Sequence, residues 1–145
     1  MLGLVAVVVL VVGGWVVWSA VAPKPEPTAL EVTRPKNPLE PGVPALEKRI
    51  TDVAQVRRLY DTALALPSIP IGASYNCPAD HGGMYKLVFF NGETKLKTMT
   101  LKTSGCEWLA IDTDNLFLPQ DVRQTRLGKA DFYAIFSSTT GIAVR

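Results

Sequence analysis

The side chains best suited to chemistry in this sequence are Cys77, Asp80 and His81, which lie together in the run CPADH, and Cys106, which lies further along the chain. A zinc site normally repeats close Cys or His spacings, whereas this chain has two cysteines and one histidine. A nucleophilic Cys77–His81 pair would need a third group that orients the imidazole, and the second cysteine would cap the thiol. We therefore predict no catalytic residue, no metal site and no cofactor.

The two cysteines are expected to bond to each other. An exported domain with two cysteines normally forms a disulfide, and two are too few for a multi-disulfide scaffold. Closing the loop between Cys77 and Cys106 would stabilise the folded state by about 3.5 kcal/mol if the chain-entropy treatment holds. A structural disulfide is thus the first prediction, and the metal site and the reactive thiol are its alternatives.

The remaining motifs do not support other ligand classes. The segment from Asp112 begins like a calcium-binding loop, but Phe117 occupies the position that requires glycine and no glutamate stands at the twelfth position. The chain has no phosphate-binding glycine loop and no GxSxG nucleophile motif. A net charge of +2 gives no sign of nucleic-acid binding, so no such partner is predicted.

Uncharged residues fill the N-terminus from Leu2 to Ala22, with Trp15 and Trp18 near the end of the run. At about 1.5 Å per residue, a helix of these 21 residues would be about 31 Å long, which is close to the hydrocarbon thickness of a bilayer. We predict that residues 1–22 form a transmembrane helix that attaches the protein to the membrane. A cleavable signal sequence, which would leave a secreted domain, is the alternative.

The signals for orientation conflict. Lys24, Arg34 and Lys36 follow the apolar run, and the positive-inside rule would place the C-terminal domain in the cytosol. The cysteine pair instead favours an oxidising compartment. We give the cysteines more weight and predict a single-pass membrane protein with an extracytoplasmic domain.

Composition divides the rest of the chain into a linker and a domain. Residues 23–44 contain seven of the eleven prolines and no apolar periodicity, which predicts an extended, polyproline-II-like tether. Residues 45–145 are enough for one small domain with a thin core.

Within this domain, the local patterns predict two helices and three strands. Asp52 is a good N-cap for a helix that ends before Pro67, and Phe132, Ile135 and Phe136 follow helical spacing near the C-terminus. Alternating runs with turn residues between them predict strands over 84–90, 93–103 and 106–112, and a short strand is expected around 45–51. The predicted fold class is α+β: a three-stranded antiparallel meander flanked by two helices and preceded by the N-terminal transmembrane helix.

The strand register follows from taking Asn91-Gly92 and Ser104-Gly105 as two-residue turns. In this register Lys86 lies opposite Lys97, Lys97 opposite Asp112, and Lys102 opposite Glu107. Both faces of the sheet are then apolar, so either the helices cover both faces or one face binds a partner. The first face would carry Tyr85, Leu87, Phe89, Leu96, Leu109 and Ile111. The candidate binding face would carry Val88, Phe90, Met99, Leu101 and Trp108, beside Cys106.

Several of these positions also carry a resemblance. The run from Leu59 to Thr94 and the later SGCEWLAI resemble uncharacterised bacterial secreted proteins and lipoproteins, in which LY and LP are followed by NCP, an aspartate, YxLxF and a GC strand. The resemblance covers about 90 residues and implies export and a paired Cys77–Cys106, but it implies no known activity. The N-terminus departs from it, because it lacks a basic n-region and a lipidation cysteine. The matching positions are Leu59, Tyr60, Leu66, Pro67, Cys77, Pro78, Asp80, Gly82, Tyr85, Leu87, Phe89, Gly105, Cys106, Phe132 and Gly141.

These observations predict a membrane-tethered extracytoplasmic domain that acts as a noncatalytic binding or interaction module of the cell envelope, with an envelope protein or a wall polymer as its partner. An extracellular enzyme or enzyme inhibitor is the first alternative, and it requires a cleft that gathers Asp80, His81, Asp112 and Asp114. An accessory subunit of a membrane complex that faces the cytosol is the second alternative, and oxidised cysteines would contradict it.

Overall fold

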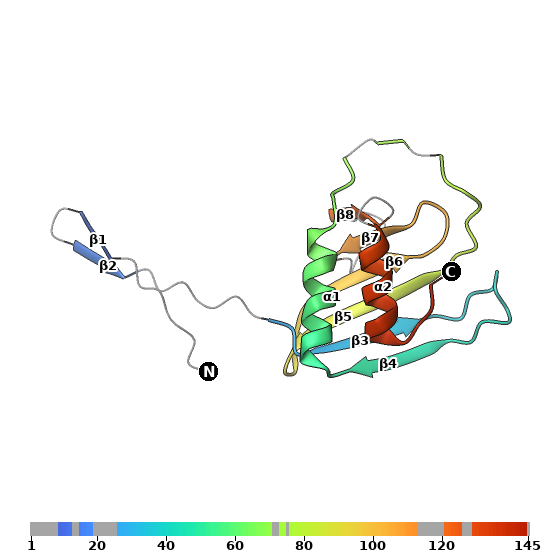
Figure 1. Ribbon diagram of the computed structural model, residues 1–145, viewed down its shortest axis with the longest axis horizontal. Coiled ribbons are helices and arrows are strands. Elements are labelled where there is room, and N and C mark those ends of the chain that lie inside the picture. The colour runs from blue at the N-terminus through green and yellow to red at the C-terminus, as the bar shows by residue number, and fades with distance from the viewer. Residues whose placement is uncertain are drawn as a thin grey trace.

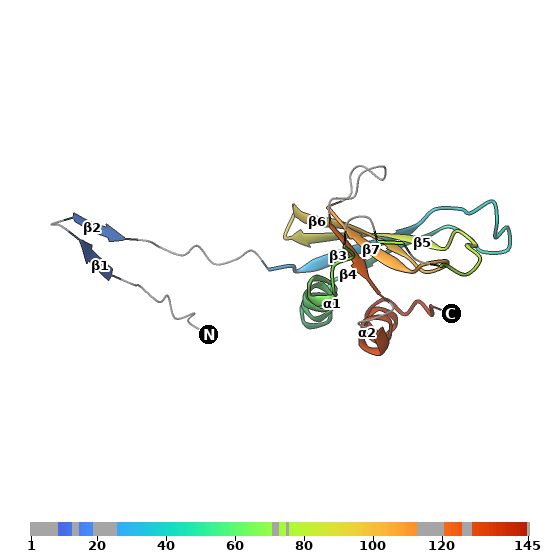
Figure 2. The same cartoon turned by 90° about the horizontal axis from the view of Figure 1, so that it is seen from above.

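The sheet at the centre of the fold has six antiparallel strands, and two helices lie against one of its faces (Figure 1; Figure 2). The computed structural model describes residues 9–12, 15–18, 26–70, 73–74, 76–112, 121–125 and 129–144. The strand order is β4-β3-β5-β6-β7-β8. The elements of this domain are β3 (Ala29–Arg34), β4 (Leu46–Ile50), α1 (Val53–Ala65), β5 (Met84–Asn91), β6 (Thr94–Lys102), β7 (Trp108–Ile111), β8 (Asp121–Gln124) and α2 (Lys129–Thr140).

The N-terminal prediction was wrong: two short strands lie where a transmembrane helix was expected. β1 (Val9–Val12) pairs antiparallel with β2 (Trp15–Trp18). Both are made of valine, leucine and tryptophan, and β-branched and aromatic residues favour strands. The sequence between them is Gly-Gly, which is a two-residue hairpin signal. Within the described residues, no helix has the length and apolar character needed to cross a bilayer.

The predicted three-stranded meander was also wrong, because the sheet has six strands. β5, β6 and β7 are present in the predicted order, but β3, β4 and β8 extend the sheet on both sides. β3 lies inside residues 23–44, where we expected a linker, and it pairs with both β4 and β5. Its Leu30 and Val32 are fully buried, because alternate residues of the strand face the helices.

The turn between β5 and β6 lies one residue later than predicted. Asn91 pairs with Thr94, so Gly92 and Glu93 form the turn. Gly92 has φ = +56° at the first turn position, a backbone angle that glycine adopts without steric cost. The local Asn-Gly signal therefore identified the hairpin correctly but placed its turn wrongly.

A bulge at Leu96 moves the register further. Leu96 has no partner residue on β5, and Lys86 pairs with Thr100 rather than with the predicted Lys97. The difference between positions 100 and 97 is three, which is an odd number. Because neighbouring residues of a strand point to opposite faces, this odd shift moves every β6 side chain after the bulge, from Lys97 to Lys102, to the other face.

The β6–β7 register differs by one residue, since Lys102 pairs with Trp108 rather than with Glu107. As a result, Met99 and Leu101 lie beside Leu109 on the same face as the apolar residues of β3 and β5. The sheet thus has one strongly apolar face, as expected for an antiparallel sheet packed on one side. The fully buried residues on this face of the sheet are Leu30, Val32, Leu87, Phe89, Met99, Leu101 and Leu109.

Both helices cover this apolar face, which corrects the prediction that they could cover both (Figure 2). Tyr60 of α1 contacts Phe89 with ring centroids 5.0 Å apart, and Phe136 of α2 contacts Tyr85 at 5.6 Å. Since the observed register places the large apolar residues on one face, burying them requires both helices on that side.

Charged side chains complete the ends of the helices. Asp52 accepts a hydrogen bond from the Gln55 backbone N–H at 3.1 Å, as predicted for the N-cap of α1. At the C-terminal ends, Arg123 of edge strand β8 donates to the Leu66 carbonyl at 2.9 Å, and Lys48 of edge strand β4 donates to the Thr140 carbonyl at 2.7 Å. A cation at a helix C-terminus also interacts favourably with the helix dipole.

Candidate functional site

The α1–β5 loop spans residues 66–83, of which the structure describes 66–70, 73–74 and 76–83. Its first part lies along the edge of the sheet, where the Ile69 N–H donates to the Val122 carbonyl at 2.7 Å. In its described part it has one isolated bridge, between Ser68 and Arg123, and no helix or strand of its own. Loops longer than about 12–15 residues are uncommon in compact domains and are often functional.

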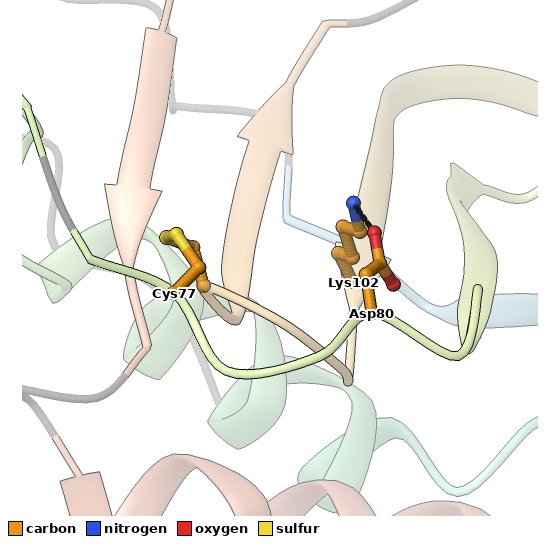
Figure 3. The surroundings of a disulfide bond; sticks show 4 residues. Cys77, Asp80 and Lys102 are labelled. Atoms are coloured by element: carbon orange, nitrogen blue, oxygen red, sulfur yellow. Dashed lines mark ion pairs between the residues drawn. A yellow bond between two sulfur atoms is a disulfide. The ribbon is translucent and has the colours of Figure 1, made fainter.

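A disulfide attaches this loop to the β6–β7 loop, residues 103–107, and confirms the predicted pairing of Cys77 with Cys106 (Figure 3). The two Cα atoms are 4.7 Å apart, although the residues are 29 positions apart in sequence. No cysteine of the described chain is free, so the predicted alternatives that need a thiol lose their ligand or nucleophile.

Asp80 is the centre of a polar network between these two loops. Its Oδ1 accepts hydrogen bonds from Ser104 Oγ at 2.6 Å and from the Gly82 N–H at 2.8 Å, and its carboxylate forms an ion pair with Lys102 (Figure 3). The hydrogen bond from Lys102, followed by those from Ser104 and Gly82, lowers the pKa of Asp80 from 3.8 to about 2. Asp80 is therefore a fixed anion at neutral pH that joins the two loops.

Two glycines allow the loops to approach closely. Gly105 has φ = +67°, and a Cβ there would lie 3.2 Å from Asp80 Cβ. A Cβ on Gly83 would lie 2.6 Å from Thr103 Oγ1, at the point where the Thr103 N–H donates to the Gly83 carbonyl at 2.9 Å. A side chain at Gly83 would displace the Thr103 hydroxyl, and one at Gly105 would crowd Asp80 and strain the backbone.

The β3–β4 loop, residues 35–45, forms the third side of this region. Asn37 Nδ2 donates to the His81 carbonyl at 2.7 Å, and Asn37 Oδ1 accepts from the Leu39 N–H at 3.0 Å. Leu39 is 71% exposed. We call the surface formed by residues 35–45, 76–83 and 103–107 the loop surface. The proline-rich composition of residues 23–44 predicted a tether, which hid this part of the surface.

A small cleft of about 180 Å³ lies beside Gly82 and Gly83. Arg34 forms part of its wall and is held in place by neutral groups: Nε and Nη2 donate to the Pro44 carbonyl at 3.2 and 2.9 Å, and Nη1 donates to the Tyr85 hydroxyl at 3.1 Å. The cleft is lined by Arg34, Pro35, Lys36, Asn37, Pro38, Glu40, Gly82, Gly83 and Met84.

The structure divides the candidate binding face of the sheet between two environments. Met99 and Leu101 are fully buried beneath the helices. Val88, Phe90 and Trp108 lie half-buried on the face without helices. Cations accompany the two aromatic rings there, with Arg49 Cζ 5.4 Å from the Phe90 ring centroid and Lys102 Nζ 5.9 Å from that of Trp108.

The acidic residues of the enzyme alternative do not gather at one place. Asp80 forms an ion pair with Lys102, and Asp112 forms one with Lys97 at 2.5 Å. These two lysines are five positions apart on β6, which corresponds to about 17 Å along a strand. Asp114 lies outside the described residues.

Comparison of the chain with known protein families, with curated proteins and with solved structures gave no match. The loop surface and its cleft are therefore the basis for inferring a function.

Proposed function

We propose that this protein is a noncatalytic binding module of an oxidising, extracytoplasmic compartment and that it binds its partner with the loop surface. The observation that carries the proposal is the disulfide that attaches the irregular 66–83 loop to the β6–β7 loop. Disulfides persist in exported proteins and are rare in reducing compartments, which supports a location outside the cytosol.

The way in which the loops are held supports binding. Asp80 binds Ser104 of the β6–β7 loop and Lys102 at the end of β6, and its bond from the Gly82 N–H orders its own loop. Asn37 joins the third loop to His81. A loop that is already ordered loses little conformational entropy when it binds a partner, so its contacts contribute more fully to affinity. Binding residues are also found preferentially on loops that a rigid scaffold positions.

The loop surface also presents an apolar contact point. Leu39 exposes 71% of its surface at the tip of the β3–β4 loop, between exposed Pro38 and half-buried Glu40. Single exposed apolar residues are normal on protein surfaces, so it is the position of Leu39 on the ordered loop surface that makes it the contact residue to test. We infer a cell-envelope protein as the partner, and a wall polymer is the other outcome to test.

The experiment measures binding of the full-length oxidised protein to two immobilised fractions of the encoding organism's envelope, its proteins and its purified wall polymer. Leu39→Ser removes the apolar contact. Val53→Ser is the matched control, because Val53 is the other large apolar residue with marked exposure, at 38%, among the residues that the structure describes. Val53 follows β4 at the end opposite to the β3–β4 loop.

We expect saturable binding to the protein fraction that falls at least about tenfold with Leu39→Ser, within the range of effects of interface contact residues, and is unchanged with Val53→Ser. Saturable binding to the wall polymer alone would overturn the protein partner. Equal losses with both serine variants would overturn the loop surface as the site, and so would an absence of binding to either fraction.

A further inference from the structure

We propose that the cleft beside Gly82 and Gly83 binds the C-terminal carboxylate of a peptide that ends in an apolar residue; this deepens the proposed function by naming a ligand class, and it rests on that function. The cleft, at about 180 Å³, is smaller than the roughly 300–1,000 Å³ of sites for drug-sized ligands. Its size therefore suits one terminal residue rather than a whole metabolite.

Arg34 supplies the group that would recognise the carboxylate. A guanidinium has five N–H donors, and three of them are used on the Pro44 carbonyl and the Tyr85 hydroxyl. Two N–H groups thus have no acceptor within the described part of the chain, and neither group that holds Arg34 is an anion. A positioned guanidinium whose charge is not neutralised is well suited to accept a carboxylate through charge-assisted hydrogen bonds.

The other charges of the lining favour a monoanion. Lys36 adds a second positive charge and Glu40 a negative one, so with Arg34 the lining has two cations and one anion, a net charge of +1. Among the described residues, no ion pair joins Glu40 to either cation. A carboxylate carries one charge at neutral pH, whereas a phosphate monoester carries nearly two, which this lining would balance less well.

The apolar part of the ligand also has a place. Most of the surface inside the cleft is apolar, and Pro35, Pro38 and Met84 contribute to it. The bond from Asn37 to the His81 carbonyl holds one wall against the other before any ligand binds. A pre-formed cleft with an apolar lining and one oriented charged group has the usual features of a ligand site.

The test titrates the full-length, oxidised, 15N-labelled protein with three peptides and follows the backbone amide signals of Gly82, Gly83 and Met84. The first peptide, acetyl-Ala-Ala-Leu, has a free carboxylate, and the second is its C-terminal amide. The third, acetyl-Ala-Glu-Ala-amide, presents a side-chain carboxylate in place of a terminal one. We expect saturable shifts at these amides with the free acid, and at least about tenfold weaker binding of the other two, which is the loss expected for one charge-assisted pair.

Charge variants then test the lining. Lys36→Gln should weaken binding of the free acid about threefold and Glu40→Gln should strengthen it about threefold, because each changes one exposed charge beside the ligand. Arg34→Lys keeps the positive charge but loses the planar fork, so binding should fall about tenfold. The urea midpoint of each variant shows whether it is folded. If Arg34→Lys does not fold, Lys36→Gln and Glu40→Gln still test the inference, because Lys36 is exposed and Glu40 is half-buried.

Equal binding of the acid and its amide would overturn the carboxylate assignment. If the glutamate peptide binds as tightly as the free acid, the preference for a C-terminal carboxylate is wrong. If the amides of Gly82, Gly83 and Met84 do not shift, the cleft is not the binding site. If the peptides fail while Leu39→Ser still abolishes binding to the envelope protein, this inference is wrong and the proposed function stands. If the peptides bind but no envelope fraction does, the proposed partner is wrong and the cleft stands.

Discussion

Removing the disulfide with Cys77→Ser and Cys106→Ser should destabilise the domain by about 3.6 kcal/mol. The chain-entropy relation gives this value at 25 °C for the 29-position separation of the two cysteines. The cost acts on the unfolded chain, which gains freedom when the cross-link is lost. The polar contacts of Asp80 remain in the folded state, so we expect the double variant to fold.

The assay is urea unfolding of three samples: the oxidised protein, the protein reduced with a phosphine, and the double serine variant. With an m-value of about 2 kcal/mol/M, the midpoint should fall by about 1.8 M in both the reduced protein and the variant. The m-value should rise slightly, because an unfolded chain without the cross-link exposes more surface. The reductant should leave the double variant unchanged, which is the internal control.

Amide hydrogen exchange locates the effect. The Thr103 N–H bonds to the Gly83 carbonyl beside the disulfide, and the Val56 N–H bonds to Asp52 in the core helix α1. Loss of the cross-link should reduce protection of both, and most strongly at Thr103, because the loops can then open without unfolding the core. A loss of stability below about 1 kcal/mol would refute the entropic reasoning for this loop. Unequal midpoints of the reduced protein and the variant would show that the serines themselves perturb the fold.

Three further changes test other parts of the structure. The folded pKa of Asp80, about 2, lies below its ordinary 3.8, so its ion pair stabilises the fold above about pH 4 and this contribution is lost as the pH falls toward 2. Because this carboxylate is 41% exposed, we expect its ion pair to contribute about 1 kcal/mol. In urea titrations the protein should be more stable than Asp80→Asn by this amount at pH 7, and the difference should shrink toward pH 2. A difference that does not change with pH would contradict this prediction. Thr98→Val should stabilise the domain by about 1 kcal/mol in thermal unfolding, because Thr98 Oγ1 is buried and has no hydrogen-bond partner among the described residues. A lower Tm would contradict this reasoning. Arg123→Met should cost about 1–2 kcal/mol, because the carbonyls of Leu64 and Leu66 lose their donor; unchanged protection of the last turn of α1 in hydrogen exchange would show that this cap is unimportant.

The parts that the sequence predicted correctly depend on local signals. The N-cap at Asp52, the helical spacing near Phe132 and the hairpin around Asn91 each come from a few neighbouring residues, and all are present. The disulfide was predictable because the chain has two cysteines and therefore one pairing.

The parts that failed depend on distant contacts or on ambiguous composition. The segment around Val9 and Trp15 is apolar enough for a membrane helix and β-branched enough for a hairpin, and hydropathy alone does not separate the two. β3 was missed because prolines surround Leu30 and Val32 and hid a short alternating strand. The bulge at Leu96 has no local signature, and it is favourable because it brings the apolar residues of β6 to the helix-covered face.

The strand register connects the core to the loop surface. With the predicted pairing, Lys102 would lie opposite Glu107 and would have a carboxylate beside it. The observed pairing buries Leu101 against Leu109, and it therefore places Trp108 opposite Lys102, whose ammonium forms an ion pair with Asp80. Burial of apolar side chains thus determines which cation meets the carboxylate that joins the two loops. A change in the core that moved β6 by one residue would remove Lys102 from Asp80 and weaken the loop surface without touching any of its residues.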